Sequence, residues 1–305
     1  MNDDRLARQA LAAIPAFAAD APSARIMRLK GLTNHVFKIE AQNGSYTLRL
    51  PGAGTASIID RRVEEINGRA AAASGIAPEM LYFGADGVMI TRFIEGATLS
   101  PSRFGDDPTA LERVADLLCH LHNDCAAFAR EFRVFDIMEN YTIILMQRGP
   151  PLSDNQLESI RLTQEARAVL RANPVQTRPC HCDPTGANLI DNGERMWLID
   201  WEYSGMNDPA WDLAYLSIEA DLDPASDQRL LTLYLGRAPG TAEIARMRVY
   251  KALCQHLSAL WAMIQHMNGN RSADFLGYAE ATFERCRSRM LALDFTENID
   301  AIRRG

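Results

Sequence analysis

The chain has 305 residues, of which 47% are hydrophobic, and a formal net charge of −7 at pH 7. This length allows one large or two ordinary domains with a sizeable core, and the composition is typical of a soluble globular protein. The acidic balance is a small argument against a nucleic-acid partner and suits a cationic substrate. No apolar run is as long as a membrane span.

The first ninety-odd residues are predicted to be rich in strands. The apolar N-terminal run follows acidic residues and is interrupted by Pro15, so we expect a short surface helix and not a signal peptide. Two hairpins are predicted from strands 36–41, 46–50, 80–84 and 88–94, with turns at 42–45 and 86–87. A helix is predicted over 58–74, ended by Gly75.

From residue 96 onward, amphipathic patterns predict long helices. These cover 111–122, 154–172 and 243–268. The only clear hairpin in this half surrounds Asn192-Gly193. We therefore predict an α+β, bilobal fold with a small β-rich N-terminal lobe (1–95), a hinge near 91–96 and a larger, mainly helical C-terminal lobe (96–305).

The cysteines predict a cytoplasmic protein with reduced thiols. None of the six forms a C-x-x-C pair, and a chain of this size does not depend on disulfides. Cys180 and Cys182 flank His181, but their side chains alternate along an extended segment with that of His181, so we expect no shared metal ion. His122 lies on the apolar face of its helix and is expected to be a satisfied core or interlobe residue and not a ligand.

The segment from His181 to Asp200 is the most informative part of the chain. His181, Asp183 and Asn188 have the H-x-D-x-x-x-x-N spacing of a kinase catalytic loop, with Asp as the base and Asn as a metal ligand. The alternative is an ordinary polar turn followed by a strand that ends at Asp200. A P-loop, a complete dinucleotide fingerprint and a serine-hydrolase elbow are all missing.

A hairpin folded symmetrically about Asn192-Gly193 pairs Asn188 with Trp197 and returns Asp200 to the end that holds Asp183. The sequence thus predicts three polar side chains that converge on one point. Two of them suit Mg²⁺, and one can take a proton from a substrate hydroxyl. This combination favours phosphoryl transfer over the ordinary-turn alternative.

In these motifs the chain resembles the choline/ethanolamine kinase family, a branch of the aminoglycoside phosphotransferase superfamily with a bilobal protein kinase-like fold. The resemblance covers about residues 31–283. It is most specific over 199–214, which matches the family's I-D-[FW]-E-Y-…-D-[IL] pattern without a gap.

The resemblance implies a role for each residue of the predicted catalytic loop. Asp183 is the catalytic base, and Asn188 and Asp200 are Mg²⁺ ligands. His181 structures the loop, and Asp212 holds it from below.

The resemblance also implies an ATP site in the N-terminal lobe. Gly31-Leu32-Thr33-Asn34 is similar to the family's G-L-[TS]-N phosphate loop, Arg49 takes the place of the usual basic residue, and Glu64 is its acidic partner. The hinge residues whose backbone would hold adenine include Met89, Arg92 and Phe93. Three alternatives stay open: Arg49 as a solvated strand residue, Asn34 as a turn residue, and Glu65 in place of Glu64.

Four residues match positions that contact the amino alcohol in choline kinases: Glu202, Glu219, Trp261 and Tyr278. An ammonium group over an aromatic face gains roughly 0.5–2 kcal/mol. Ser258 stands where the eukaryotic type has a second Trp, which leaves the head group open. The alternative for Trp261 is simple helix packing.

The resemblance therefore implies an ATP- and Mg²⁺-dependent kinase that transfers the γ-phosphate to the hydroxyl of a small amino alcohol, choline or ethanolamine. The expected partner is a small cationic alcohol, with neither nucleic acid nor a membrane involved. The alternatives are a related kinase for thiamine, an aminoglycoside or a methylthio-sugar, and a nucleotide-binding pseudokinase. The intact Asp183, Asn188 and Asp200 disfavour the pseudokinase.

Overall fold

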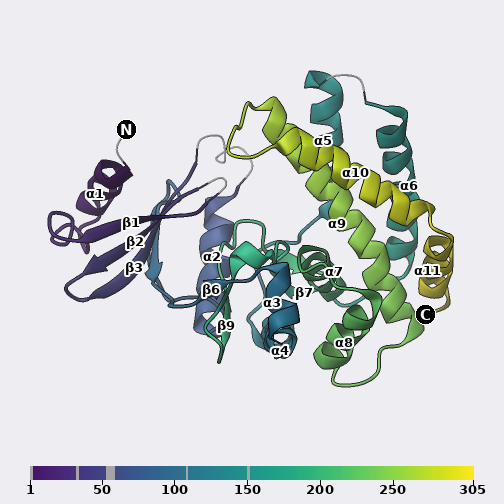
Figure 1. The fold of residues 1–305 in the computed structure, drawn as a ribbon, viewed down its shortest axis with the longest axis horizontal. Helices are drawn as coiled ribbons and strands as arrows, with labels where there is room; N and C mark the ends of the chain where they lie inside the picture. The colour runs from purple at the N-terminus through teal and green to yellow at the C-terminus, as the bar shows by residue number, and fades with distance from the viewer. Residues whose placement is uncertain (1–2, 32–33, 53–58, 108, 150–151) are drawn as a thin grey trace.

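The computed structural model describes residues 3–31, 34–52, 59–107, 109–149 and 152–305. A small lobe built on an antiparallel sheet lies beside a larger, mainly helical lobe (Figure 1). This arrangement confirms the predicted α+β, bilobal architecture. The placement of the lobe boundary at residue 95 stays a prediction.

The sheet of the small lobe has five strands. They are β1 (Arg25–Leu29), β2 (His35–Ala41), β3 (Gly44–Leu50), β4 (Met80–Phe83) and β5 (Met89–Arg92). Their order is β1-β2-β3-β5-β4, and every neighbouring pair is antiparallel. Both predicted hairpins are confirmed, since β2 pairs with β3 and β4 with β5. The strand β1 lies outside the predicted strands.

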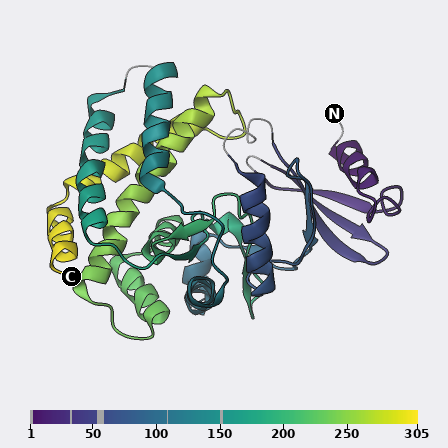
Figure 2. The same cartoon turned by 180° about the vertical axis from the view of Figure 1, so that it is seen from behind.

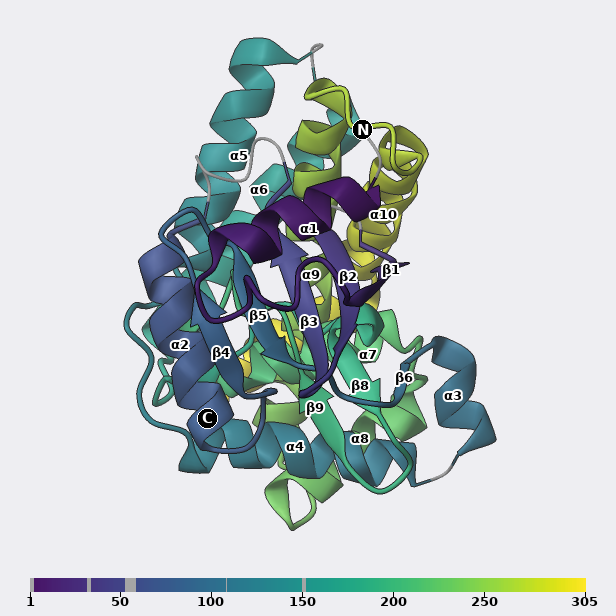
Figure 3. The same cartoon turned by 90° about the vertical axis from the view of Figure 1, so that its left-hand side faces the viewer.

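Side chains alternate along these strands and give the sheet two different faces. Phe37, Ile39 and Leu48 point to one face, where they form a core with α1 (Asp3–Ala13) through Leu11. Figure 3 shows α1 lying across this face of the sheet. The opposite face carries the alternate residues Val36, Thr47, Arg49, Met89 and Thr91. The small lobe therefore keeps one apolar face for folding and turns a polar face toward the large lobe.

The helix α2 (Arg61–Ala73) stands between the sheet and the large lobe (Figure 2). Asp60 caps its first turn, and Gly75 follows its end with a φ of +75°, as predicted for that glycine. Residue 58, where the predicted helix begins, lies outside the described residues.

The buried face of α2 packs against the large lobe. Ala71 belongs to the large lobe's core and not to the core beneath α1. Asn67 Nδ2 donates to the Ser204 carbonyl at 3.1 Å, and Asn67 Oδ1 accepts from the Ala129 amide at 2.9 Å. The helix is therefore fastened to the large lobe by both packing and hydrogen bonds.

Nine helices of the described residues form most of the large lobe. They are α3 (Pro101–Asp106), α4 (Ala110–Asp124), α5 (Val134–Arg148), α6 (Asp154–Ala172), α7 (Pro209–Glu219), α8 (Pro224–Leu235), α9 (Thr241–Met267), α10 (Phe275–Leu291) and α11 (Leu293–Arg304). The three predicted long helices are confirmed as α4, α6 and α9. Across the ranges that the structure describes, no helix is long and apolar enough to cross a membrane.

The segments that connect these helices contain short strands in two small sheets. One sheet has the order β6-β8-β9, formed by β6 (Ala97–Thr98), β8 (Leu189–Asp191) and β9 (Met196–Leu198). The other pairs β10 (Gly205–Asn207) with β7 (Arg178–Cys180). The short 3₁₀ helix η2 (Gly186–Asn188) leads into β8.

The hairpin between β8 and β9 forms, but its predicted register is wrong. Trp197 pairs with Ile190 and not with Asn188, whose carbonyl instead accepts from the Ile199 amide at 3.0 Å. The cause is the side chain of Asn192, whose Oδ1 accepts from the two amides at residues 194 and 195, at 3.0 and 2.8 Å. This Asx-type turn moves the centre of the hairpin one residue along the chain. Asp200 still returns to the Asn188 end.

Candidate active site

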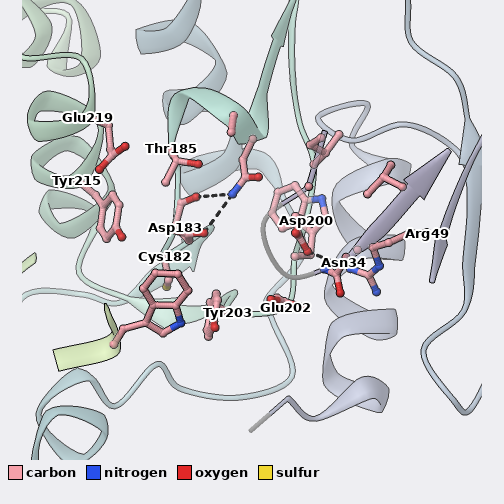
Figure 4. Close-up of a pocket in the computed structure, with 18 of the residues that line it drawn as sticks. Asn34, Arg49, Cys182, Asp183, Thr185, Asp200, Glu202, Tyr203, Tyr215 and Glu219 are labelled. Carbon is pink, nitrogen blue, oxygen red and sulfur yellow. Dashed lines mark hydrogen bonds and ion pairs between the residues drawn. The ribbon is translucent and has the colours of Figure 1, made fainter. Parts of the chain in front are cut away.

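A cavity of about 1760 Å³ lies between the two lobes. Its walls include twelve of the predicted site residues: Asn34, Arg49, Met89, Arg92, Phe93, Asp183, Asn188, Asp200, Glu202, Glu219, Trp261 and Tyr278. Glu64 and His181 do not line the cavity and are buried behind it. Figure 4 shows how the central residues face one another.

The loop after β7 is held from below by Asp212 of α7. The Asp212 carboxylate accepts from the amides of His181 at 2.8 Å and Cys182 at 2.9 Å. Cys182 has a φ of 69°, an unusual backbone conformation for a non-glycine residue, and the indole of Trp211 donates to its carbonyl at 3.0 Å. His122 contacts the same carboxylate at 3.1 Å and Tyr234 at 2.9 Å, which agrees with its expected role as a satisfied core residue.

His181 ties the loop to the strand that precedes Asp200. Burial holds the pKa of His181 below its usual value, so its ring is neutral, and Nε2 donates to the Ile199 carbonyl at 2.9 Å. The ring also packs edge-on against Trp201, with 4.8 Å between centroids. These contacts place His181 as a support of the loop, away from the cavity.

Asp183 and Asn188 face the cavity together. Asn188 Nδ2 donates to the Asp183 carbonyl at 3.0 Å and to its carboxylate oxygen Oδ2 at 3.1 Å (Figure 4). Burial, followed by the negative charge of Asp200, raises the pKa of Asp183 well above its usual value. A carboxylate in this setting accepts a proton more readily than one in water.

Arg49 connects the sheet, α2 and Asp200. Its Nη1 lies 2.9 Å from Asp200 Oδ1 and forms a shorter ion pair with Glu64. Burial works against the charged form, but Glu64 and Asp200 together hold the pKa of Arg49 above its usual value. The neighbouring Glu65 instead pairs with the surface residue Arg69 at 2.9 Å. Of the two candidate carboxylates, the one next to Arg49 is therefore that of Glu64.

The oxygens in this region suit a hard divalent cation. One carboxylate oxygen from each of Glu64, Asp200 and Glu202 lies within 4.8 Å of the others. Asn188, which lines the same cavity as Asp200, offers an amide oxygen as a further ligand. Mg²⁺ prefers such ligands and binds through one or two carboxylates plus substrate phosphates.

The two glutamates predicted for the acceptor lie on different sides of Asp183. Glu202 lies toward Arg49 (Figure 4), and Arg61 Nη1 approaches it at 3.4 Å. Burial and then Asp200 raise the pKa of Glu202 to about 7. Glu219 lies on the opposite side of Asp183, and burial raises its pKa as well. The structure thus separates Glu202 from Glu219.

The side chains of the hinge segment alternate between the two faces of the sheet, with Met89 and Thr91 on the face turned toward the large lobe. Arg92 follows Thr91 on β5, so its side chain points to the other face, where its guanidinium lies 3.1 Å from Glu79 and over the ring of Tyr46. The amides of Arg92 and Phe93 already donate to other carbonyls, so a ligand must use different main-chain groups here.

The predicted phosphate loop is described only at its ends. A Cβ at Gly31 would lie 2.5 Å from the Asn34 carbonyl oxygen, so the loop requires glycine there. Asn34 Oδ1 accepts from the Gly52 amide at 3.3 Å. Leu32, Thr33 and the loop residues 53 and 54 lie outside the described residues.

Two residues near the predicted site were absent from the predictions: Tyr215, which lines the cavity, and Arg61, which does not. Tyr215 lies beside Asp183, and its hydroxyl is 3.1 Å from Ser258 Oγ. Arg61 donates to Glu64 at 2.7 Å. Helical spacing provided a signal for both, because Tyr215 precedes Glu219 by four residues and Arg61 precedes Glu64 by three.

Comparison with known proteins identifies the family. The model of the choline/ethanolamine kinase family matches residues 26–229. The chain belongs to the choline/ethanolamine kinase family. It is therefore a phosphotransferase with an alcohol group as acceptor.

Individual relatives agree with this assignment. Protein LicA of Haemophilus influenzae is 28% identical over 254 residues, which cover 80% of this chain and 94% of LicA. The crystal structure of a choline/ethanolamine kinase family protein from Mesorhizobium loti has a TM-score of 0.90 and 38% identity, covering 99% of this chain and 100% of that one. Choline kinase LicA from Streptococcus pneumoniae shares the fold, with a TM-score of 0.80 and 23% identity over 95% of this chain and 99% of that one.

Proposed function

We propose that this chain is an ATP- and Mg²⁺-dependent kinase that transfers the γ-phosphate to the hydroxyl of a small amino alcohol, choline or ethanolamine. The observation that supports this best is the arrangement of Asp183, Asn188 and Asp200 around one point of the interlobe cavity, with Arg49 beside it. Phosphoryl transfer needs positioning and neutralisation of charge more than covalent chemistry, and these four side chains supply both.

The nucleotide is placed against the polar face of the small-lobe sheet. Arg49 offers a planar, permanently charged group for phosphate oxygens, and Glu64 fixes its direction. Asn188 and Asp200 would hold Mg²⁺, which neutralises charge on the phosphates when bound. Adenine would lie along the main chain of residues 89–94.

Asp183 is proposed to accept the proton of the acceptor hydroxyl. Its carboxylate is held by Asn188 and is also hydrogen-bonded by Tyr215, and these contacts fix its direction toward the acceptor. Loss of that proton lets the hydroxyl oxygen attack the γ-phosphorus in line with the leaving ADP oxygen.

The cationic end of the acceptor is placed on the far side of Asp183 from Arg49. Glu219, Trp261 and Tyr278 line this part of the cavity. A bound ammonium group would favour the ionised form of Glu219 and gain from the aromatic faces. Glu202 is the exception among the predicted acceptor residues, because its neighbours Arg61 and Asp200 belong to the phosphate side.

A panel assay of ATP consumption tests the proposal. Choline, ethanolamine, thiamine and an aminoglycoside are each offered with and without Mg²⁺. We expect Mg²⁺-dependent consumption with choline or ethanolamine and none with the same protein carrying Asp183→Asn. Consumption with thiamine or the aminoglycoside alone would favour those alternatives, and no consumption with any acceptor would favour a pseudokinase.

A further inference from the structure

The interlobe cavity continues beyond the acceptor residues along an apolar wall. We call this the α5 wall and define it as Ile137, Ile143 and Ile144 of α5 with Leu257 of α9 and Phe275 of α10. Phe275 packs edge-on against Trp261, with 5.5 Å between ring centroids. The wall is therefore continuous with the position proposed for the ammonium group.

Four of the five side chains of the α5 wall are only partly covered by protein, whereas Phe275 is buried. Ile143 is 44% exposed, and Ile137, Ile144 and Leu257 are half-buried, although all four face the same cavity as Asp183. Isoleucines at positions 137 and 144 are two helical turns apart and share one side of α5. Asp136 and Asn140 of α5 also line the cavity, so these apolar side chains lie beside polar ones. Covering the apolar side chains with a ligand group is favourable because it removes their surface from water.

The size of the cavity leaves room for such a ligand group. Its volume of about 1760 Å³ exceeds the roughly 300–1,000 Å³ of ordinary small-molecule sites. The nucleotide would occupy the small-lobe side, against Arg49 and the hinge. The α5 wall belongs to the large lobe and lies on the acceptor side.

The orientation of the acceptor determines which of its groups meets the wall. Its hydroxyl must lie at Asp183, and its nitrogen is proposed to lie among Glu219, Trp261 and Tyr278. The other substituents of the nitrogen then point away from Asp183 and toward Phe275 and α5. They are the part of the acceptor that the wall can contact.

We propose that the site, besides choline and ethanolamine, takes amino alcohols whose nitrogen carries an apolar substituent larger than methyl, such as an alkyl chain or an aromatic ring, and phosphorylates them more efficiently than choline. This inference rests on the proposed function and specifies its acceptor class. The reaction is unchanged: the hydroxyl oxygen forms a bond to the γ-phosphorus, its proton passes to Asp183, and the bond from that phosphorus to ADP breaks.

A homologous series of acceptors tests the proposal. The probes are choline and its analogues in which one N-methyl group is replaced by propyl, hexyl or benzyl, each at saturating MgATP. We expect kcat/KM to rise by up to roughly fourfold for each methylene that the wall buries, the change that burial of one methylene group corresponds to. If kcat/KM stays constant or falls along the series, the proposal is wrong. That result is expected if a loop of the protein covers the α5 wall when the cavity closes.

A matched pair of variants separates the wall from a general effect of hydrophobic acceptors. Ile143 lines the cavity and is 44% exposed, whereas Ile66 of α2 does not line it and is 43% exposed. The measured quantity is the ratio of kcat/KM for the hexyl analogue to that for choline in the same variant. We expect Ile143→Asn to lower this ratio at least threefold and Ile66→Asn to leave it unchanged.

Equal ratios in the two variants would overturn the wall as the binding surface. Thermal melting confirms that both variants are folded. If no amino alcohol of any kind is phosphorylated, the proposed function itself fails. If choline is phosphorylated but chain length has no effect, only the inference about the substituent fails.

Discussion

The phosphate side and the acceptor side of the cavity are built differently. On the phosphate side, Arg49 forms ion pairs with Glu64 and Asp200, so a strand, a helix and a loop are tied together before any ligand binds. On the acceptor side, Glu219 has no ion pair among the described residues, and Tyr278 is 42% exposed.

This difference shows which side chains of the cavity are already positioned before a ligand binds. The side chains of the phosphate side are held by ion pairs in the absence of a ligand, whereas those of the acceptor side have fewer such contacts. Substitutions on the phosphate side should therefore affect rate and stability, and substitutions on the acceptor side should affect mainly KM for the acceptor.

The largest effect is expected from Asp183→Asn, which would remove the proposed proton acceptor between the two sides. Loss of a general base typically lowers the rate by about 10²–10⁴-fold. The affinity for MgATP should stay close to that of the wild type, because the substitution leaves Arg49 and Asp200 in place. Steady-state kinetics and titration calorimetry measure the two quantities. A near wild-type kcat would exclude Asp183 as the base.

The substitution Glu64→Gln tests the contribution of the ion pair between Arg49 and Glu64 to stability. The side chain of Glu64 is 1% exposed and that of Glu65 is 35% exposed, which makes Glu65→Gln the matched control. Removing one partner of a buried ion pair typically costs about 3–5 kcal/mol, and a surface pair contributes about 0–1 kcal/mol. Urea unfolding should show this contrast. If both variants lose a similar free energy of unfolding, the ion pair between Arg49 and Glu64 does not stabilise the fold more than a surface pair does.

The scaffold of the acceptor side can be tested by pH. His256 of α9 packs on Phe283 of α10, and burial lowers its pKa from 6.5 to about 4. Because the unfolded chain takes up this proton first, the free energy of unfolding should fall as the pH decreases from 6.5 to 4, by up to about 3 kcal/mol. In His256→Leu this part of the pH dependence should disappear. If the free energy of unfolding of His256→Leu depends on pH as that of the wild type does, a group other than His256 causes the pH dependence.

The smallest effect is expected on the acceptor side itself. Trp261→Ala should raise KM for choline by several-fold to about thirty-fold, the equivalent of about 0.5–2 kcal/mol, with less effect on KM for ATP. A neutral isostere with carbon in place of nitrogen should bind poorly to the wild type and be less sensitive to the substitution. If both ligands respond equally, Trp261 acts only as an apolar surface.

The sequence was sufficient where the local pattern and the long-range structure agree. The two small-lobe hairpins, α2 and the three long helices follow from periodicity and turn residues, and the return of Asp200 follows from the β8–β9 hairpin. The register of that hairpin did not follow, because it depends on a side-chain contact of Asn192 that competes with the usual two-residue turn.

The site was less predictable where residues meet across the lobes. The choice between Glu64 and Glu65 required the direction of α2, which is set by contacts more than a hundred residues away, such as that of Asn67 with Ser204. The separation of Glu202 from Glu219 could not be read from the sequence either, because both follow the catalytic loop closely in the chain. The roles assigned to these residues remain predictions.

The attachment of α2 to the large lobe has a consequence for local unfolding. The strands with α1 form one buried core, and α2 contributes to the other, so opening of the sheet would break the ion pair between Arg49 and Glu64 but leave Ala71 of α2 in the large-lobe core. Such units exchange their amide hydrogens at separate rates. We expect the amides of β1, β2 and β3 to exchange together, and those of α2 to follow α4 and α9 instead. Arg49 would then be carried by one cooperative unit and Glu64 by another.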